Sequence, residues 1–421
     1  MMVILHVQPV AERGGSDQTL LNLLRTLPRA ELENHVVFPA PSPLADELEA
    51  TGAHLHIVPM RRLTLSGNLG YRLAYVVAWP LVVFRLARLA RRLRADVIHT
   101  NSLHSLYGFA AARLARRPHV WHAREIVVQS PAALRLERAL ARRFADVVVA
   151  MSSAVAAQLD PHNVRVIIDG VDPDEFVPDR AGRFRADARI GDDVPLCGCA
   201  GRIDTWKGVD VLLDAFPAVR ARVPTAELVI AGAAVRGKET YAASLRARAE
   251  AMVGVRWLGQ RDDIADVLAD LDVFVLPSTA PEPFGMVLIE ALASGVPVVA
   301  TDAGGPQEIA RLAASGEQGP LASGGHERDP VRLVPPGQAP ALAAAVTELL
   351  LTSTTSTERR RARRSLWPVP PPDYAALFRE VVAASRSGEP TTTRRPARTA
   401  RPGRRRTPSR SSGRAGCGPP S

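Results

Sequence analysis

The chain has 421 residues, 46% of them hydrophobic, which is enough for two domains with separate cores. Its formal net charge is +10, but residues 386–421 carry ten arginines against the single acid Glu389, so the rest of the chain is close to neutral. This distribution argues against a folded surface that binds nucleic acid. Cys197, Cys199 and Cys417 are too few and too badly spaced for a disulfide framework or a zinc site, so we expect a reducing, cytoplasmic setting.

The first half of the chain alternates short apolar runs with longer amphipathic ones, the pattern of a parallel sheet with helices on both faces. Strands are expected at residues 3–7, 35–38, 54–58, 96–100, 119–122, 146–150 and 164–168. Helices are expected between them, notably at residues 19–27, 69–93 and 134–143. The N-terminal run lacks the basic start and long apolar core of a secretory signal, so we interpret it as the first strand.

The pattern restarts in the second half, after a loop-like linker. Strands are expected at residues 196–200, 227–231, 255–258, 272–276 and 297–300, and helices at 209–221, 241–250, 264–269 and 287–293. We therefore predict an α/β protein with two doubly wound, Rossmann-like domains. The predicted parts are an N-terminal domain (1–170), a linker (171–194), a C-terminal domain (195–352), an irregular segment with a returning helix (353–385) and a disordered basic tail (386–421).

The helix at residues 69–93 has two interpretations. No stretch reaches the roughly 20 apolar residues that span a bilayer, and the nearest, residues 75–84, contains Pro80. The same helix carries several arginines: Arg72, Arg85, Arg88, Arg91, Arg92 and Arg94. It therefore suits the surface of an anionic membrane, but it equally suits a helix with its apolar side on the sheet and its arginines in solvent, which we favour.

Ligands of such sheets bind at the carboxyl ends of the strands, so we searched the strand–helix junctions. Gly14 and Gly15 follow the first strand and precede a helix, where backbone amides can approach an anion, although an ordinary turn has the same pattern. His122 ends a strand and could hydrogen-bond a sugar hydroxyl, although a lone histidine there is more often structural.

Two cations follow the strand at residues 196–200. Arg202 could grip phosphate oxygens through two parallel hydrogen bonds, and Lys207 would place a compact charge beside them. Lys207 and Lys238 are the only lysines in a chain that otherwise uses arginine. This choice of residue favours a phosphate, rather than solvent, as the neighbour of Lys207.

The last junction, residues 281–290, contains two glutamates. Prolines on both sides hold Glu282 in extended backbone, and Gly285 lets the next helix begin close to a ligand. Glu290, about two turns into that helix, can reach the same ligand. Carboxylates accept hydrogen bonds from vicinal hydroxyls, so the pair suits a ribose or hexose. An acid near a helix start is common, but this pair on an otherwise apolar helix is not.

These residues resemble the retaining glycosyltransferases called group 1 or family 4, whose signature is two glutamates with seven residues between them. The similarity covers GGSDQTLLNLL, WHAREI, IDGVDPDEF, GRIDTWKGVDVLLDAF, EPFGMVLIEALASGVPVVATDAGGPQEI and LVPPGQAPALAAAV, in the expected order. It implies a GT-B architecture, with an acceptor-binding N-terminal domain and a donor-binding C-terminal domain facing a cleft. It also implies transfer of a hexose-type sugar from a nucleotide diphosphate to a hydroxyl of a glycan, glycolipid or small molecule.

The resemblance assigns roles to individual residues. Arg202 and Lys207 would neutralise the departing diphosphate, and His122 would contact the sugar near the reacting carbon. Glu290 would hold the ribose, and Gly15 would approach the phosphate. The hydroxyls of the sugar would be held by Glu282 and by the backbone of three residues, Phe284, Gly285 and Met286. No metal, no cofactor and no protein nucleophile is expected. The expected partners are a nucleotide sugar and a hydroxyl acceptor, without specific nucleic acid; an anionic membrane surface stays open as the alternative interpretation of the helix at residues 69–93.

Two segments depart from the family pattern. Residues 311–330 are expected to be an inserted loop near the donor, and residues 352–372 lack the usual regular helix, before a returning helix at 373–385 that packs on the N-terminal domain. Alternatives are a non-catalytic nucleotide-sugar-binding protein, or an epimerase or phosphorylase on the same fold. An NAD-dependent oxidoreductase is disfavoured because no strand is followed by Gly-x-Gly-x-x-Gly.

Overall fold

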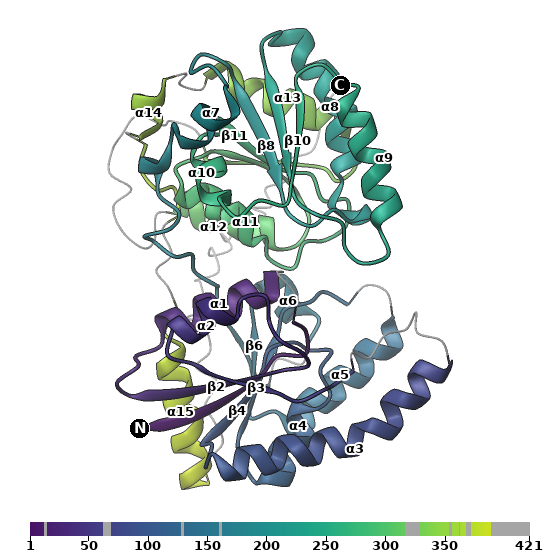
Figure 1. Cartoon of the computed structure of the whole chain (residues 1–421), viewed down its shortest axis with the longest axis vertical. Helices are drawn as coiled ribbons and strands as arrows, with labels where there is room; N and C mark the ends of the chain where they lie inside the picture. The colour runs from purple at the N-terminus through teal and green to yellow at the C-terminus, as the bar shows by residue number, and fades with distance from the viewer. Residues whose placement is uncertain are drawn as a thin grey trace, which may run out of the picture. The chain divides into compact units, whose positions relative to one another are not determined.

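The structure is a computed structural model, and it describes residues 1–11, 15–61, 69–127, 130–159, 162–315, 329–352, 356–361, 363–367 and 372–388. These residues belong to one compact unit, Met1–Thr391. Two parallel sheets with helices between their strands form a two-domain α/β fold (Figure 1). The predicted fold class is therefore confirmed. The domain limits drawn from the sequence stay predictions.

The N-terminal sheet has seven parallel strands in the order β3-β2-β1-β4-β5-β6-β7. They are β1 (Met2–Val7), β2 (Leu32–Phe38), β3 (His54–Ile57), β4 (Val97–Thr100), β5 (His119–Ala123), β6 (Val147–Ala150) and β7 (Val164–Val166). Each predicted strand of this half is present, with ends shifted by at most three residues. Helices cover both faces of a parallel sheet, so its strands are buried on both sides and appear in the sequence as continuous apolar runs.

Helices flank this sheet on both faces. They are α1 (Gly15–Thr26), α2 (Ala45–Ala50), α3 (Leu69–Arg92), α4 (Gly108–Ala115), α5 (Pro131–Phe144) and α6 (Ser153–Ala157). Helix α5 begins three residues before its predicted start, because the Ser130 hydroxyl accepts a hydrogen bond from the Ala133 amide and Pro131 suits the first helical position. A local cap therefore fixed an end that hydrophobic periodicity left open.

The returning helix is α15 (Tyr374–Ser387), and it packs on the N-terminal sheet as expected (Figure 1). Phe378 is fully buried in one core with Ile4 and Val36. Arg165 of β7 forms an ion pair with Glu380, with 2.7 Å between Nη1 and Oε2. The helix runs to Ser387, two residues beyond its predicted end. The basic tail from residue 389 lies outside the described residues.

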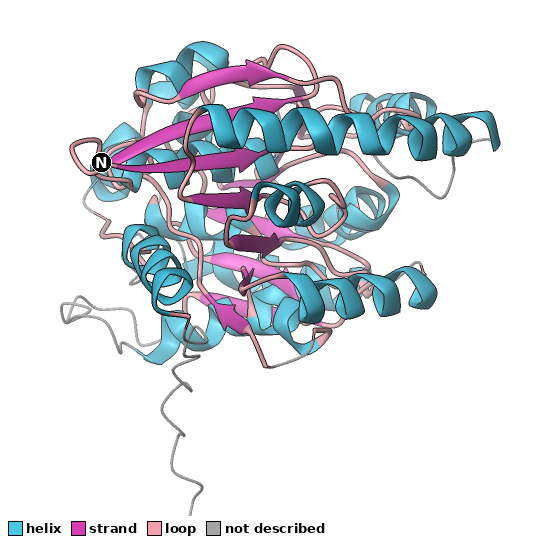
Figure 2. Ribbon diagram, turned by 90° about the horizontal axis from the view of Figure 1, so that it is seen from below, coloured by secondary structure: helices cyan, strands magenta, loops and turns pink. Residues whose placement is uncertain are grey.

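The C-terminal sheet has six parallel strands in the order β10-β9-β8-β11-β12-β13. They are β8 (Leu196–Ala200), β9 (Glu227–Ala231), β10 (Val255–Gly259), β11 (Val273–Leu276), β12 (Val298–Thr301) and β13 (Val331–Val334). The helices are η1 (Pro178–Arg180), α7 (Arg183–Ala188), η2 (Thr205–Lys207), α8 (Val209–Arg222), α9 (Glu239–Glu250), α10 (Ile264–Ala269), α11 (Met286–Ala293), α12 (Gly305–Ser315), α13 (Ala339–Thr352) and α14 (Thr357–Arg361). Figure 2 shows strands lying between helices.

The amino edge of the C-terminal sheet is held by buried ion pairs. Asp272, directly before β11, contacts three arginines at 3.0 to 3.2 Å, namely Arg185, Arg360 and Arg363. Their side chains are at most 9% exposed. These bonds fasten α7 and the segment around α14 to the sheet. Among the described residues between α13 and α15, the short helix α14 is thus held by charges rather than by a long apolar face.

Two expectations about α12 and α3 were wrong. Residues 311–330 are not all loop, since α12 continues to Ser315; residues 316–328 lie outside the described part of the chain. Among the described residues one helix, Gly70–Arg92, is long and apolar enough to cross a membrane by length and composition alone. The unbroken apolar run at residues 75–84 is too short to span a bilayer, whereas the whole of α3, which was predicted at residues 69–93, contains further apolar residues on both sides of that run.

Candidate functional site

The predicted donor residues lie where the order of the C-terminal strands reverses. Strands β8 and β11 are neighbours, and the chain leaves them toward opposite sides of the sheet. Such a switch point leaves a crevice at the carboxyl ends of the two strands, which is where doubly wound sheets bind ligands. The loop after β8 carries Arg202 and Lys207, and the loop after β11 carries Glu282.

A glycine places Lys207 at this point. Gly208 follows η2 with φ +70°, and a Cβ there would lie 2.0 Å from the carbonyl oxygen of Pro277 in the neighbouring loop. Only glycine combines this backbone conformation with such a close approach. At the start of η2, the Asp204 carboxylate accepts a hydrogen bond from the Thr205 amide at 2.7 Å. The loop is therefore short, fixed and pressed against the end of β11.

Arg202 lies exposed in the same loop. It makes no hydrogen bond or ion pair with another residue that the structure describes. A hollow of about 10 Å³ beside it is lined by residues that include Gly201, Arg202 and Lys207. An unpaired guanidinium fork next to an ammonium group suits the oxygens of a diphosphate.

Backbone hydrogen bonds to the loop before α12 hold Glu282 in place. The Glu282 amide donates to the Ala303 carbonyl at 3.1 Å, and the Gly305 amide donates to the Glu282 carbonyl at 2.7 Å. A Cβ on Gly304 would lie 2.3 Å from the Glu282 carbonyl oxygen. The neighbouring side chain of Phe284 is fully buried. The flanking prolines are thus only part of what holds the extended backbone of Glu282.

Lys207 and Glu282 form an ion pair across the two loops. The Lys207 Nζ atom lies 2.7 Å from Oε2 and 3.0 Å from Oε1 of Glu282. The Ser278 hydroxyl donates a third hydrogen bond to Oε2 at 2.9 Å. The side chains are 16% and 8% exposed, so both groups are shielded but reachable. A cation that suits a phosphate and a hydrogen-bond acceptor that suits hydroxyls therefore lie side by side.

Helix α11 follows this loop and carries the second glutamate. Gly285 precedes it with φ +105°, and the first two amides of the helix, those of Met286 and Val287, have no acceptor within it, whereas the Leu288 amide donates to the Gly285 carbonyl. The side chain of Glu290 is buried. Burial, and to a smaller extent the negative charge of Glu175, raises the pKa of Glu290 to about 8. At neutral pH this carboxyl is protonated, so it can donate as well as accept hydrogen bonds.

His122 and Gly15 lie at the N-terminal sheet, and no hydrogen bond or ion pair between described residues joins them to the Lys207–Glu282 pair. Gly15 begins α1, and apart from its chain neighbours and its own helix no described residue has an atom within 4 Å of where its Cβ would be. Gly14 lies outside the described residues. His122 is fully buried, and its Nδ1 accepts a hydrogen bond from Arg124 at 3.3 Å.

His122 is neutral. Burial, with smaller effects of the charges of Arg124 and His99, lowers the pKa of His122 well below its usual range. Because a guanidinium only donates, Nδ1 must be the acceptor and Nε2 carries the hydrogen. This Nε2 is buried without a hydrogen-bond partner in the described structure. Its N–H is the one unused hydrogen-bonding group of His122.

A buried polar chain at the carboxyl edge of the N-terminal sheet was not predicted. Val7 of β1 lies opposite Thr100 of β4, so the next residues, Gln8 and Asn101, are adjacent, and Asn101 Nδ2 donates to Gln8 Oε1 at 2.7 Å. Arg124 follows β5 and donates to Asn101 Oδ1 at 2.6 Å. The missed signal was position, since each residue directly follows a strand.

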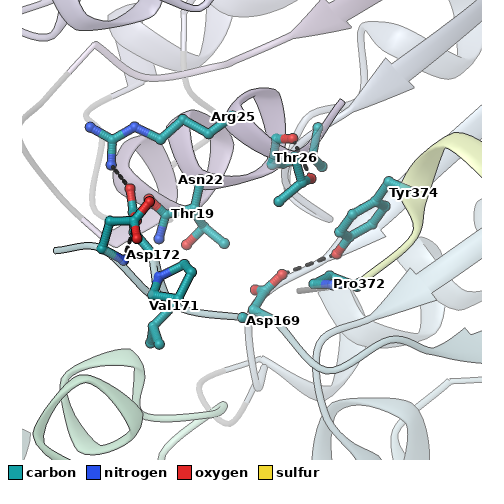
Figure 3. Close-up of a pocket in the computed structure, with 13 residues that line it drawn as sticks. Thr19, Asn22, Arg25, Thr26, Asp169, Val171, Asp172, Pro372 and Tyr374 are labelled. Carbon is teal, nitrogen blue, oxygen red and sulfur yellow. Dashed lines mark hydrogen bonds and ion pairs between the residues drawn. The ribbon is translucent and has the colours of Figure 1, made fainter. Parts of the chain in front are cut away.

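The same series of hydrogen bonds continues to Asp169, just before the predicted linker, and to α15. Arg124 Nη1 lies 2.7 Å from Oδ2 of Asp169, and the Tyr374 hydroxyl donates to Oδ1 of Asp169 at 3.0 Å (Figure 3). The Arg124 and Asp169 side chains are each 4% exposed. The buried carboxylate of Asp169, two residues before the predicted linker, thus joins the residue after β5 to the C-terminal helix.

A cavity of about 320 Å³ lies next to this carboxylate, between α1, residues 169–174 and the start of α15 (Figure 3). Arg25 of α1 bridges its rim through an ion pair with Asp172 at 3.1 Å. Its polar lining includes Thr19, Asn22, Arg25, Thr26, Asp169 and Tyr374. The cavity could not be predicted from the sequence, because three segments far apart in the chain form its walls.

Hydrogen bonds also join the loop that carries Glu282, and helix α12, to the start of α6. Glu308 of α12 accepts from the amide and the hydroxyl of Ser153, both at 2.6 Å. The Ser152 hydroxyl donates to the Pro283 carbonyl at 2.5 Å. The backbone of Glu282 and Pro283 is thus tied both to the start of α12 and to the start of α6.

Two family models match most of the chain. Residues 194–352 match the family described as Glycosyl transferases group 1, and residues 13–175 match Glycosyltransferase Family 4. The chain is 31% identical over 321 residues to the GDP-mannose-dependent alpha-mannosyltransferase of Mycobacterium tuberculosis (strain CDC 1551 / Oshkosh), which covers 70% of this chain and 77% of that protein.

Other curated relatives match over shorter stretches. The chain is 33% identical over 217 residues to the lipopolysaccharide core biosynthesis mannosyltransferase LpsB of Rhizobium meliloti, covering 45% of this chain and 61% of that protein. It is 39% identical over 154 residues to the phosphatidyl-myo-inositol mannosyltransferase of Mycobacterium leprae, covering 36% of each. These matches span less than two thirds of either relative.

Solved structures share the fold. Anabaena HepE in complex with UDP and glucose has a TM-score of 0.68 and 25% identity, covering 92% of this chain and 100% of that chain. Sucrose-phosphate synthase from Thermosynechococcus elongatus has a TM-score of 0.63 and 20% identity, covering 92% and 99%, and shows the fold alone.

Proposed function

Because the chain belongs to the group 1 glycosyltransferases of the GT-B type, we propose that it moves a hexose-type sugar from a nucleotide-diphosphate donor to a hydroxyl of a glycan, glycolipid or small-molecule acceptor. The observation that carries the proposal is the Lys207–Glu282 ion pair at the switch point of the C-terminal sheet. The sugar of such a donor is bonded to the outer phosphate. A phosphate-binding cation beside a hydroxyl-binding carboxylate suits that connectivity.

Donor binding would divide this pair. Lys207 would turn to the phosphate, with Arg202 gripping further oxygens, and Glu282 would accept hydrogen bonds from sugar hydroxyls. The backbone amides at the start of α11, around Gly285, would face the same sugar. Glu290 would bind the ribose, and in its protonated form it can donate to one hydroxyl and accept from the other.

The chemistry follows from charge separation. Breaking the anomeric bond leaves positive charge on the sugar and negative charge on the diphosphate, so fixed cations at Arg202 and Lys207 stabilise the transition state. We assign this task to the two side chains instead of to a metal ion. Glu282 is held by Lys207 and Ser278 and is given the role of hydroxyl binding, not of a nucleophile.

The transfer is proposed to retain the anomeric configuration. The acceptor hydroxyl attacks from the face that the diphosphate leaves, and a phosphate oxygen takes the hydroxyl proton. The unused Nε2–H of His122 would donate to the sugar, and Gly15 would let the backbone of α1 approach the phosphate. Two buried thiols, Cys197 and Cys199, suit the cytoplasmic setting that we propose for the reaction.

The test compares the two lysines of the chain. Lys207→Ala should lower turnover by a factor on the order of 10² or more, because it removes one preorganised charge from the transition state. Lys238→Ala is the matched control, since Lys238 lies outside the proposed site, just before α9, and should leave turnover unchanged. The donor is first identified by thermal shift with a panel that includes GDP-mannose and UDP-glucose.

Transfer to an acceptor separates the proposal from the alternative of a non-catalytic nucleotide-sugar-binding protein. Both alternatives predict a donor-dependent thermal shift, and only the enzyme forms a glycosylated product. Equal turnover in the two lysine variants would remove Lys207 from the site, and donor binding without any transfer would favour the binding protein.

A further inference from the structure

Helix α3 has two apolar faces. One is buried in the N-terminal core, through Val82, Val83, Leu86, Ala87 and Ala90. The other is open to solvent and consists of Leu73 (57% exposed), Val76 (65%), Val77 (78%), Leu81 (52%) and Phe84 (53%). Single exposed apolar side chains are normal, but five on one helix face mark an interaction surface. The prediction that the apolar side of this helix packs on the sheet is correct for one of these faces only.

The exposed face continues into basic residues. Positions 73, 77, 81, 84 and 88 recur every three or four residues and so share one side of the helix. This stripe begins with Leu73 and ends with Arg88. The helix contains no acid, and its arginines are exposed: Arg72, Arg85, Arg88, Arg91 and Arg92.

The helix cannot cross a bilayer while the domain stays folded. Leu86, Ala87 and Ala90 have no exposed surface, and they pack in one core with Leu5 of β1 and Ile98 of β4. Only 33% of its most apolar window is buried, and that share anchors it to the sheet. Figures 1 and 2 both show α3 running past the sheet that it covers. Its outer face is therefore available to a surface.

We infer that the outer face of α3, defined by Leu73, Val76, Val77, Leu81 and Phe84 with the neighbouring arginines, docks on an anionic lipid bilayer. The apolar stripe would enter the boundary between headgroups and acyl chains, and the arginines would contact lipid phosphates. A second copy of the same face is a poorer occupant, because it would bring arginines against arginines without an acid on either helix. Charge complementarity thus selects the bilayer.

Docking in this way would place the bilayer beside the proposed acceptor side of the molecule. The connection from β3 to α3 leaves the sheet at the carboxyl ends of its strands, so α3 begins at the edge that carries Asn101 and Arg124. The exposed apolar residues occupy the N-terminal two thirds of the helix, nearest that edge. Docking itself does not require transfer activity.

The experiment is co-sedimentation of the full chain with phosphatidylcholine vesicles, with and without phosphatidylglycerol, at low and physiological salt. Val77→Glu is compared with Val253→Glu, because Val77 and Val253 are 78% and 74% exposed and the change in charge is the same. Val77→Glu should lower the partition coefficient about tenfold or more, and Val253→Glu should leave it unchanged. A double variant, Arg85→Gln with Arg88→Gln, should abolish the preference for phosphatidylglycerol.

Folding and donor binding are checked in the same samples by far-UV circular dichroism and by the donor-induced thermal shift, which exposed substitutions should not alter. Absence of the parent chain from anionic vesicles at low salt, or equal loss in Val77→Glu and Val253→Glu, would overturn the inference. If the parent chain does not bind vesicles, and light scattering shows that it is a dimer whereas Val77→Glu is a monomer, the occupant of this face is a second copy. A retained donor shift in any of these cases leaves the proposed function standing.

Discussion

The two sheets carry polar residues at the same topological position, but these residues have different kinds of hydrogen-bond and ion-pair partners. In the C-terminal sheet the switch point lies between β8 and β11, where Lys207 and Glu282 pair with each other beside an exposed Arg202. In the N-terminal sheet it lies between β1 and β4, where Asn101 and Arg124 form part of a closed, buried chain of hydrogen bonds. At the first edge, Lys207 and Glu282 are placed so that a ligand could replace the contacts between them. At the second edge, the polar side chains are buried and bonded to one another.

The buried titratable groups differ in the same way. Nine of the ten histidines lie between residues 6 and 162, and the tenth, His326, lies outside the described residues. The N-terminal core thus buries neutral imidazoles, whereas the C-terminal core buries arginine–aspartate pairs around Asp272 and one protonated carboxyl, Glu290. The halves should therefore respond differently to mutation and to pH.

The largest effect is expected from Asp169→Ala. This change leaves the guanidinium of Arg124 buried without its ion-pair partner, and it removes the acceptor of the Tyr374 hydroxyl. Breaking a buried pair from one side costs about 3–5 kcal/mol of unfolding free energy. Urea denaturation of the full chain, followed by circular dichroism, measures the loss.

The control is Asp172→Ala, at a position three residues after Asp169 in the chain. Asp172 pairs with Arg25 at 3.1 Å, but their side chains are 24% and 35% exposed, so the loss should stay below about 1 kcal/mol. Similar losses in the two variants would mean that the N-terminal edge is no more closed than the surface.

Much of the fold could be predicted because parallel strands covered on both faces are apolar along their whole length. Strands β8 and β9 lie at their predicted residues, and most of the longer helices were found from periodicity. Helices α12 and α13 were not among the predicted ones. Short helices such as α4 and α6 carry too few turns for a periodic signal. The attachment of α14 was not predictable, because Arg360 and Asp272 are far apart in the chain and meet only in the folded state.

The candidate site was predictable as a set of loops and not as a geometry. Arg202, Lys207 and Glu282 were found because each lies after a strand at the carboxyl edge. Their mutual distances depend on the close approaches of Gly208 and Gly304 to neighbouring backbone, which no spacing reveals. The same limit hid the environment of His122.

Acid should weaken the N-terminal half. Burial lowers the pKa of His6 to about 4, and it lowers those of His99 and His122 well below their usual range. An unfolded histidine titrates near 6.5, so below about pH 6.5 the unfolded chain binds more protons and unfolding becomes more favourable. Stability is therefore present above about pH 6.5 and is lost as the pH falls toward 4.

The loss should reach up to about 1.4 kcal/mol per pH unit for each such histidine. Urea denaturation at about pH 7 and about pH 5 measures it, and His6→Gln should make the dependence shallower because one proton-linked group is gone. If the unfolding free energies of the parent and of His6→Gln depend on pH with the same slope, the pKa of His6 is not lowered in the folded chain.

The smallest effect is expected from Glu290→Gln, and it separates the two glutamates of the C-terminal edge. With its pKa raised to about 8, Glu290 is protonated at neutral pH, so an uncharged amide of the same shape replaces a group that was already uncharged. Donor affinity at about pH 7, measured by calorimetry, should stay within about threefold of the parent. Glu282→Gln should weaken it far more, because Glu282 holds its charge against Lys207.

The pH dependence of stability gives the second readout for Glu290. A carboxyl whose pKa is raised from 4.5 to about 8 on folding binds its proton more tightly in the folded state, so the parent loses stability as the pH rises between these values. Glu290→Gln should lack this loss and gain stability relative to the parent across the same range. Equal damage to donor affinity from Glu290→Gln and Glu282→Gln at neutral pH would show that Glu290 works as a carboxylate. Both glutamates would then bind the donor as charged carboxylates.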